Sequence, residues 1–187
     1  MLTMPQKAGD LMTHMTTFED AQKLYKKYGT RSPFEIIDAV PDMKLWMSEA
    51  YPADGLRGFA TIQNRIRYAV VNSFLQPEEQ RIVAAHELGH LIRHEVRLRI
   101  QPMQDFDVYA ATGKLEREAN FFAADLLIDD EEALDEIHSC GADFFSVARK
   151  LYVPAPFFAF KLYSLVERGN TMRMPVSLDS SFLSGRR

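Results

Sequence analysis

The spacing of apolar residues divides the chain into a helical start, a strand-rich middle and a helical second half. From Thr17 to Tyr28 apolar residues recur at helical spacing, and Gly29 can end that helix. A short helix is expected after Pro33. The middle contains three segments rich in β-formers, separated by turn residues, and they predict a small antiparallel sheet: residues 44–47, 58–62 and 66–72. The turn at residues 63–65 predicts that the last two form a hairpin.

Helical periodicity returns after Pro77 and continues through most of the second half. The two strongest patterns cover residues 78–92 and 114–128, and weaker ones follow up to residue 168. The order of elements predicts an α+β fold, in which a three-stranded antiparallel sheet packs on these two helices. We divide the chain into four parts: an extension, expected to be flexible (1–16), a central domain (17–138), a C-terminal helical segment packed on it (139–168), and a flexible tail (169–187).

Composition adds few constraints beyond this pattern. With 187 residues, 47% apolar and 26% charged, the chain suits one ordinary globular domain with a small addition. A net charge of −4 argues against direct nucleic-acid binding. The single cysteine, Cys140, excludes an intrachain disulfide and fits a reducing compartment. Neither a signal peptide nor a membrane span is recognisable, so we expect a cytoplasmic protein with no membrane partner.

The first strong helix carries polar residues in an apolar run, Val83-Ala84-Ala85-His86-Glu87-Leu88-Gly89-His90-Leu91-Ile92. Residues four apart lie on one face of a helix, so His86 and His90 can bind one cation. Glu87 lies beside them and can act as general base on water activated by that cation. Imidazole ligands suit Zn²⁺, and a catalytic zinc site has three protein ligands and an open position. Because burial of these groups without a metal is costly, a pair of core histidines is the weaker explanation.

The third ligand is expected on the second strong helix. Its nearest donors are Glu116 and Glu118, followed by Asn120 and Asp125. The apolar stripe of that helix favours Glu118, although Glu116 stays open as an alternative. His94 continues the four-residue spacing, but it lies about 12 Å along the axis from His86, too far to share a tetrahedral zinc. Asp125 is expected to orient a histidine from outside the ligand shell.

Two segments together resemble the ImmA/IrrE family of metallopeptidases, which has a small gluzincin-like fold. Residues 83–90 match the family's AHELGH helix, and residues 116–128 match its E-x-E-A-N-x-F-A-x-x-L-L helix. The chain departs from the family at residues 128–130, Ile-Asp-Asp, where a Met-Pro is common. The resemblance spans about residues 17–165, and it implies a zincin-like metallopeptidase domain at 17–138.

The resemblance also implies roles for individual residues. His86, His90 and Glu118 match the zinc ligands, and Glu87 matches the general base. Tyr109, in the loop before the second strong helix, is a candidate for oxyanion assistance. In this fold a peptide substrate adds to the edge of the sheet above the metal, and we assign residues 66–72 to that edge.

The family further implies a function in gene regulation. Its members often cleave helix-turn-helix repressors, or relieve their repression, and some belong to toxin–antitoxin-like pairs. This chain has no recognisable DNA-binding helix-turn-helix, so such a partner is a separate protein. The resemblance therefore predicts a zinc endopeptidase with a protein substrate.

Two other functions stay open. A regulatory binding module would keep the metal and act without efficient proteolysis, and Glu87 argues against it because a scaffold needs no base. A structural metal protein would need a fourth protein ligand, and the sequence offers no convincing one.

Overall fold

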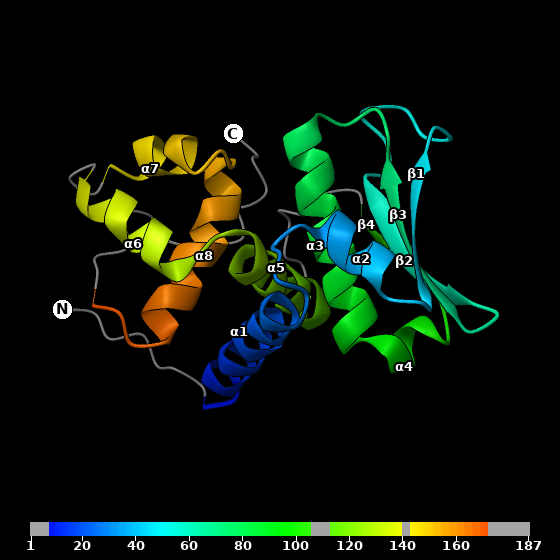
Figure 1. Ribbon diagram of the computed structural model, residues 1–187, viewed down its shortest axis with the longest axis horizontal. Coiled ribbons are helices and arrows are strands. Elements are labelled where there is room, and N and C mark those ends of the chain that lie inside the picture. Colours follow the sequence, from blue (N-terminus) through cyan, green and yellow to red (C-terminus); the bar gives the residue numbers. More distant parts are fainter. Residues whose placement is uncertain (1–7, 106–112, 140–142, 172–187) are drawn as a thin grey trace.

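The computed structural model describes residues 8–105, 113–139 and 143–171. It has helices on one side, a sheet on the other, and two buried helices between them (Figure 1). In chain order the elements are α1 (Ala8–Tyr28), α2 (Pro33–Ala39), β1 (Met43–Ser48), β2 (Gly58–Gln63), β3 (Ile66–Asn72), α3 (Pro77–Arg93), α4 (Glu95–Leu98), β4 (Met103–Asp105), α5 (Lys114–Leu127), α6 (Asp130–Ser139), α7 (Phe144–Lys150) and α8 (Ala155–Glu167). The predicted α+β class is confirmed. Helix α1 begins within the segment assigned to an extension.

The sheet is mixed and has four described strands in the order β1-β3-β2-β4. Strands β2 and β3 form the predicted hairpin, and Asn64 and Arg65 take the positive φ angles of its tight turn. Strand β1 pairs with β3 in parallel, so the expectation of a purely antiparallel three-stranded sheet is wrong in this detail. The connection 49–57 is long enough to pass the end of β3, so that β1 and β2 lie on opposite sides of that strand. The side-chain amide of Asn72 holds this connection by donating to the carbonyls of Pro52 and Leu56.

The prediction of which strand lies at the edge of the sheet is also wrong. Strand β3 (residues 66–72), which we expected at the edge, lies between β1 and β2. The edge beside the second half of the chain is β4, which pairs with β2 only, in a segment where the sequence showed no strand pattern. With three residues, β4 is too short to show the alternation from which strands are predicted.

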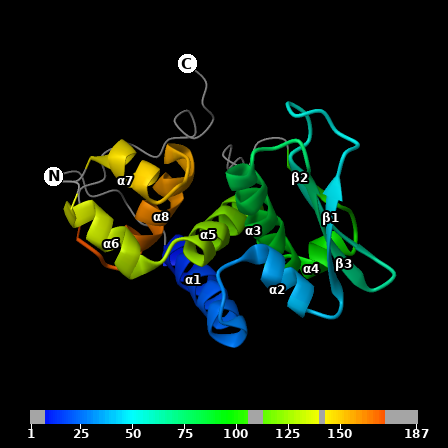
Figure 2. The ribbon, with the colours of Figure 1, turned by 45° about the horizontal axis from the view of Figure 1, so that its top comes forward.

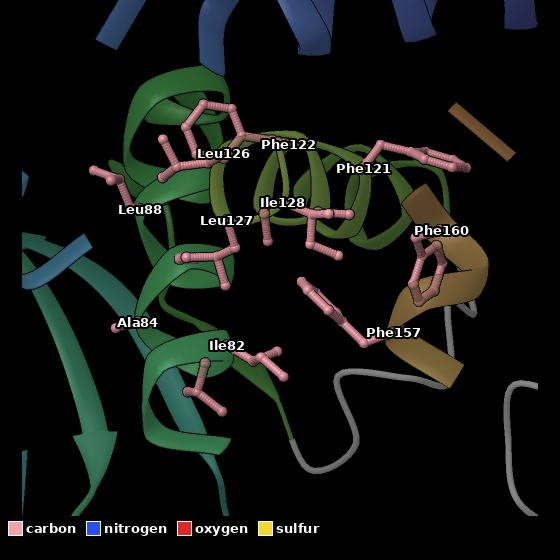
Figure 3. Packing of buried hydrophobic residues seen from close by; sticks show 14 of the residues in the cluster. Ile82, Ala84, Leu88, Phe121, Phe122, Leu126, Leu127, Ile128, Phe157 and Phe160 are labelled. Atoms are coloured by element: carbon pink, nitrogen blue, oxygen red, sulfur yellow. The ribbon is translucent and has the colours of Figure 1, made fainter. Parts of the chain in front are cut away.

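Helices α3 and α5 form the centre of the molecule. Helix α3 contacts β2 and β3 on one side and α5 on the other, while α5 also contacts α1 and α8. Figure 3 shows Leu88 of α3, Phe122 and Leu126 of α5, and Phe157 of α8 meeting in one apolar core, and all four are fully buried. Burial on this scale stabilises each large side chain by about 1.5–3 kcal/mol.

Gly89 allows α3 and α5 to approach closely. A Cβ atom at this position would lie 3.2 Å from the Cα of Ala119 and 3.0 Å from the Phe122 ring. Ala85 of α3 and Ala119 of α5 are small and fully buried, which also favours a close approach of the two helices. The absence of a side chain at Gly89 therefore permits the close packing of α5 on the motif helix.

The helices α6, α7 and α8 form a group at the far end of the molecule from the sheet (Figure 2). A buried ionic network joins this group to α5. The Nζ atom of Lys161 lies 3.1 Å from Asp125, Ser164 donates to the same carboxylate, and an Arg168 nitrogen lies 3.6 Å from it. Burial raises the pKa of Asp125, and the two cations and Ser164 oppose this by favouring the ionised form.

Replacing Lys161 by methionine is expected to destabilise the protein strongly. Lys161 and Asp125 are both fully buried, and the substitution leaves the carboxylate with only the more distant Arg168 as a cation. Breaking a buried pair costs about 3–5 kcal/mol, which urea denaturation would measure as a lower free energy of unfolding. Lys150→Met is the control, since Lys150 is half exposed in its pair with Glu136 and should cost less than about 1 kcal/mol. Equal effects of the two substitutions would contradict this account.

Candidate metal centre

The motif helix α3 places His86, Glu87 and His90 in the interior, and all three are fully buried. Pro77 opens the helix, Glu78 and Glu79 form its acidic first turn, and it ends at Arg93. Such a start is favourable because acidic residues complement the positive end of the helix dipole. The three polar residues therefore lie deep in a stable helix.

Three donor atoms converge between α3 and α5. The Nε2 atoms of His86 and His90 lie 2.9 Å apart. A carboxylate oxygen of Glu116, in the first turn of α5, lies 3.3 Å from the first and 3.4 Å from the second. Among the described residues, this is the group of histidines and acids whose donor atoms suit one metal ion, all within 4.8 Å of one another.

These distances fit a tetrahedral zinc site. Two ligand atoms, each 2.0–2.1 Å from a tetrahedral metal, are about 3.3 Å apart. The separations of 2.9, 3.3 and 3.4 Å lie close to that value. The donor set of two imidazoles and one carboxylate is also that of catalytic zinc sites, which leave a fourth position open.

Hydrogen bonds on the outer side of the rings assign their tautomers. Nδ1 of His86 lies 2.9 Å from the side-chain oxygen of Asn120 and donates to it, so its Nε2 carries a lone pair. Nδ1 of His90 lies 2.8 Å from Nδ1 of His94, whose Nε2 lies 3.1 Å from a Glu118 oxygen. If His94 donates to Glu118 and accepts from His90, then Nε2 of His90 also carries a lone pair.

With these tautomers, two lone pairs and a carboxylate face one another in a largely buried space. Three electron-rich groups at such distances repel one another unless a cation lies between them. Burial lowers the pKa of His94, although the hydrogen bond that His94 donates to the Glu118 carboxylate opposes this, and a neutral His94 is what the chain of hydrogen bonds requires. The residues present therefore fit a divalent metal.

Glu118, the third ligand predicted from the sequence, lies elsewhere in this arrangement. Its carboxylate contacts His94, and it also lies 3.6 Å from Arg93 and 3.7 Å from Lys114. Arg93 in turn forms an ion pair with Asp20 of α1. The geometry thus favours the alternative, Glu116, as the third ligand. Glu118 contacts His94, which in turn contacts His90, so Glu118 acts on the site only indirectly.

One sequence signal for Glu116 was overlooked. Glu116 and Asn120 are four residues apart, the same spacing as His86 and His90, so they lie on one face of α5. In the structure Glu116 lies near Nε2 of His86, on the side of the proposed metal, and Asn120 accepts a hydrogen bond from Nδ1 of the same ring. Asp125, expected to orient a histidine, instead binds Lys161 and Ser164. Tyr109 lies outside the described residues.

Glu87 points toward the sheet at a place where only glycine fits. A Cβ atom at Gly58, the first residue of β2, would lie 2.7 Å from a Glu87 carboxylate oxygen, 2.5 Å from Val83 and 2.9 Å from the backbone oxygen of Val70. Such distances are shorter than van der Waals contact. The absence of a side chain at Gly58 therefore makes room for the Glu87 carboxylate.

Replacing Gly58 by alanine is expected to displace Glu87 and to destabilise the fold. The added methyl group meets backbone as well as side-chain atoms, and overpacking of this kind costs about 1–3 kcal/mol. Catalytic turnover should fall more than zinc content, because the displaced residue is the proposed base and not a ligand. Gly113→Ala is the control: a Cβ there meets nothing within 4 Å, and the loss should stay below about 1 kcal/mol. Unchanged stability and turnover in Gly58→Ala would refute the close contact.

Two comparisons with known proteins bear on the family of the chain. The sequence model of a peptidase family, described as the IrrE N-terminal-like domain, matches residues 46–163, which is more than half of the chain. A relative from Bacillus phage phi105, called "Uncharacterized immunity region protein 2", is 34% identical over 114 residues, or 58% of this chain. The match covers 66% of the relative, just under two thirds of its length.

None of the helices in the described part of the chain combines the length and the apolar character that crossing a membrane requires.

Proposed function

Since the chain belongs to the peptidase family described as the IrrE N-terminal-like domain, we propose that it is a zinc-dependent endopeptidase acting on a regulatory protein. The observation that carries this proposal is the convergence of His86, His90 and Glu116 with lone pairs turned inward. Such a donor set would hold Zn²⁺. Imidazole and carboxylate ligands together suit zinc better than Mg²⁺ or Ca²⁺, which prefer oxygen alone.

A bound zinc ion would act as a Lewis acid, polarising the peptide carbonyl and making a water molecule acidic. Glu87 accepts the proton of that water and returns it to the leaving amine. Glu87 is fully buried, and the absence of a side chain at Gly58 leaves the space that its carboxylate occupies. Asn120 and His94 keep the two imidazoles in the ligand tautomer.

The edge strand β4 is the proposed place for the substrate backbone. In the described part of the chain β4 pairs with β2 on one side and offers unpaired backbone groups on the other. An extended peptide can add to such an edge as another strand. Met103 and Gln104 of β4 line a cavity together with Glu116, which connects this edge to the metal centre.

A regulatory partner is supported by the relative named for a phage immunity region. We propose that the substrate is a separate protein such as a helix-turn-helix repressor or a toxin–antitoxin-type partner, met in the cytoplasm. A pure binding module would have no use for a buried carboxylate beside the ligands, so Glu87 favours proteolysis.

The proposal is tested by measuring zinc content and chelator-sensitive cleavage together. Elemental analysis should find about one zinc per chain, as a single site of this kind holds one ion. Zinc-loaded protein incubated with a bacterial lysate should create new protein N-termini, detected by mass spectrometry, that are absent when a chelator is present. Bound zinc without any chelator-sensitive cleavage would favour the binding module, and no zinc at all would refute the metal centre.

A further inference from the structure

A cavity of about 430 Å³ lies directly beside the metal centre. Its walls come from helix α4 and the turn after it, from strand β4, and from the first turn of α5. Glu116 belongs to both the metal centre and the cavity. One of its oxygens faces the two histidines, and the residue also lines the cavity. A group bound in the cavity would therefore lie close to the reacting bond.

Among the described residues that line the cavity, two are cationic and one, Glu116, carries a carboxylate. The cations are Arg97 of α4 and Lys114 of α5. Within the described ranges, no carboxylate lies within ion-pair distance of the exposed Arg97 guanidinium. Lys114 is 69% exposed, and its nearest described carboxylate is Glu118 at 3.7 Å. Because Glu116 would be engaged by the metal, the described part of the lining has a positive net charge, in a chain whose net charge is −4.

The remaining lining residues fit a polar side chain of moderate length. Gln101 and Gln104 add amide groups, while Met103 and Leu115 form the apolar part of the wall. Gln104 and Met103 belong to β4, the edge strand of the sheet in the described part of the chain, and side chains of an added strand point alternately to its two faces. A peptide paired with β4 would thus direct one side chain toward the cavity while its backbone passes the metal.

We infer that this cavity is a specificity subsite for an acidic side chain, Asp or Glu, adjacent to the scissile bond of the peptide substrate. The inference rests on the proposed function, since it assumes that a peptide passes the metal centre. Arg97 supplies a forked donor group that suits a carboxylate, and Lys114 adds a second positive charge. The substrate class is then an acidic peptide segment, which agrees with the positive lining.

The experiment uses binding and cleavage in parallel. Zinc-loaded Glu87→Gln protein is immobilised and exposed to a random-sequence octapeptide mixture, and the retained peptides are sequenced. The same mixture is treated with zinc-loaded wild-type protein, and its cleavage sites are mapped by mass spectrometry. We compare three variants, each checked for zinc content: Arg97→Gln with Lys114→Gln, Arg97→Glu with Lys114→Glu, and the control Arg99→Gln, which removes an exposed cation paired with Glu95.

We expect Asp and Glu to be enriched about tenfold at one position of the retained peptides, as a charge-assisted contact would provide. The double glutamine variant should lose this enrichment, the double glutamate variant should prefer Lys or Arg, and Arg99→Gln should behave as the parent. Retention without an acidic excess, no retention, or an excess that survives the double substitutions would overturn the subsite. Acid-selective binding without cleavage would uphold the subsite and refute the proteolytic function, whereas cleavage without acid preference would refute the subsite alone.

Discussion

Glutamine in place of Glu87 is expected to abolish nearly all cleavage while zinc stays bound. The side chain keeps its size, and it is not one of the three convergent donors, so the proposed ligands His86, His90 and Glu116 remain in place. An amide cannot accept the proton of the attacking water. Loss of a general base lowers turnover by about 10²–10⁴-fold.

Turnover of a peptide that the wild-type protein cleaves is the decisive measurement, together with zinc per chain and the melting temperature. Glu87 is fully buried, so neutralising it should leave the melting temperature unchanged or raise it. Glu79→Gln is a matched control on the same helix, where the carboxylate pairs with Arg57 near the surface. If Glu87→Gln retained full turnover, Glu87 would not be the base.

Alanine at Glu116 is expected to weaken zinc binding far more than alanine at Glu118. The Glu116 oxygen lies 3.3 and 3.4 Å from the two imidazole nitrogens, and its loss leaves two ligands. Glu118 acts on His90 only through His94. Removing an outer partner of this kind typically costs about 10–100-fold in metal affinity, so Glu116→Ala should exceed about 100-fold and Glu118→Ala should fall within that range.

Competition with a chromophoric chelator would measure both affinities under the same conditions. Asn120→Ala provides a second outer substitution, because Asn120 binds the other imidazole, and it should resemble Glu118→Ala. The reverse order, with Glu118→Ala the more damaging, would return the ligand role to Glu118, as the family resemblance predicted.

The contrast between Glu116 and Glu118 shows how far periodicity can locate a site. The pattern of α3 located His86, Glu87 and His90, because four-residue spacing on a helix leaves little freedom. The apolar stripe of α5 was less informative, because α5 contacts α1, α3 and α8, and every residue from Glu118 to Leu127 is buried. A helix packed on three sides has no single apolar face, so its stripe could not indicate which side meets α3.

The order of strands in the sheet is a second feature that the sequence pattern could not predict. Local residue preferences predicted β1, β2 and β3 as strands, and the turn at Asn64 and Arg65 predicted the hairpin. The order of strands depends on pairings between distant segments, such as β1 with β3 and β4 with β2, which no local pattern records. The position of the edge, and with it the proposed substrate strand, therefore came only from the three-dimensional structure.

The contact at Gly89 has a consequence for metal choice. Two of the proposed ligands come from α3 and one from α5, and the backbones of these helices approach closely at Gly89 and Ala119. The distance between the two ligands on α3 and the one on α5 is therefore set mainly by the close contact of the two backbones. This contact limits the size of the ion that the centre can hold. Larger ions such as Ca²⁺, with bonds of about 2.3–2.6 Å, would need the helices to separate. Replacing Gly89 by alanine and then by valine would separate α3 and α5 in steps. The metal site would widen with each step, and its preference would shift toward ions of larger radius.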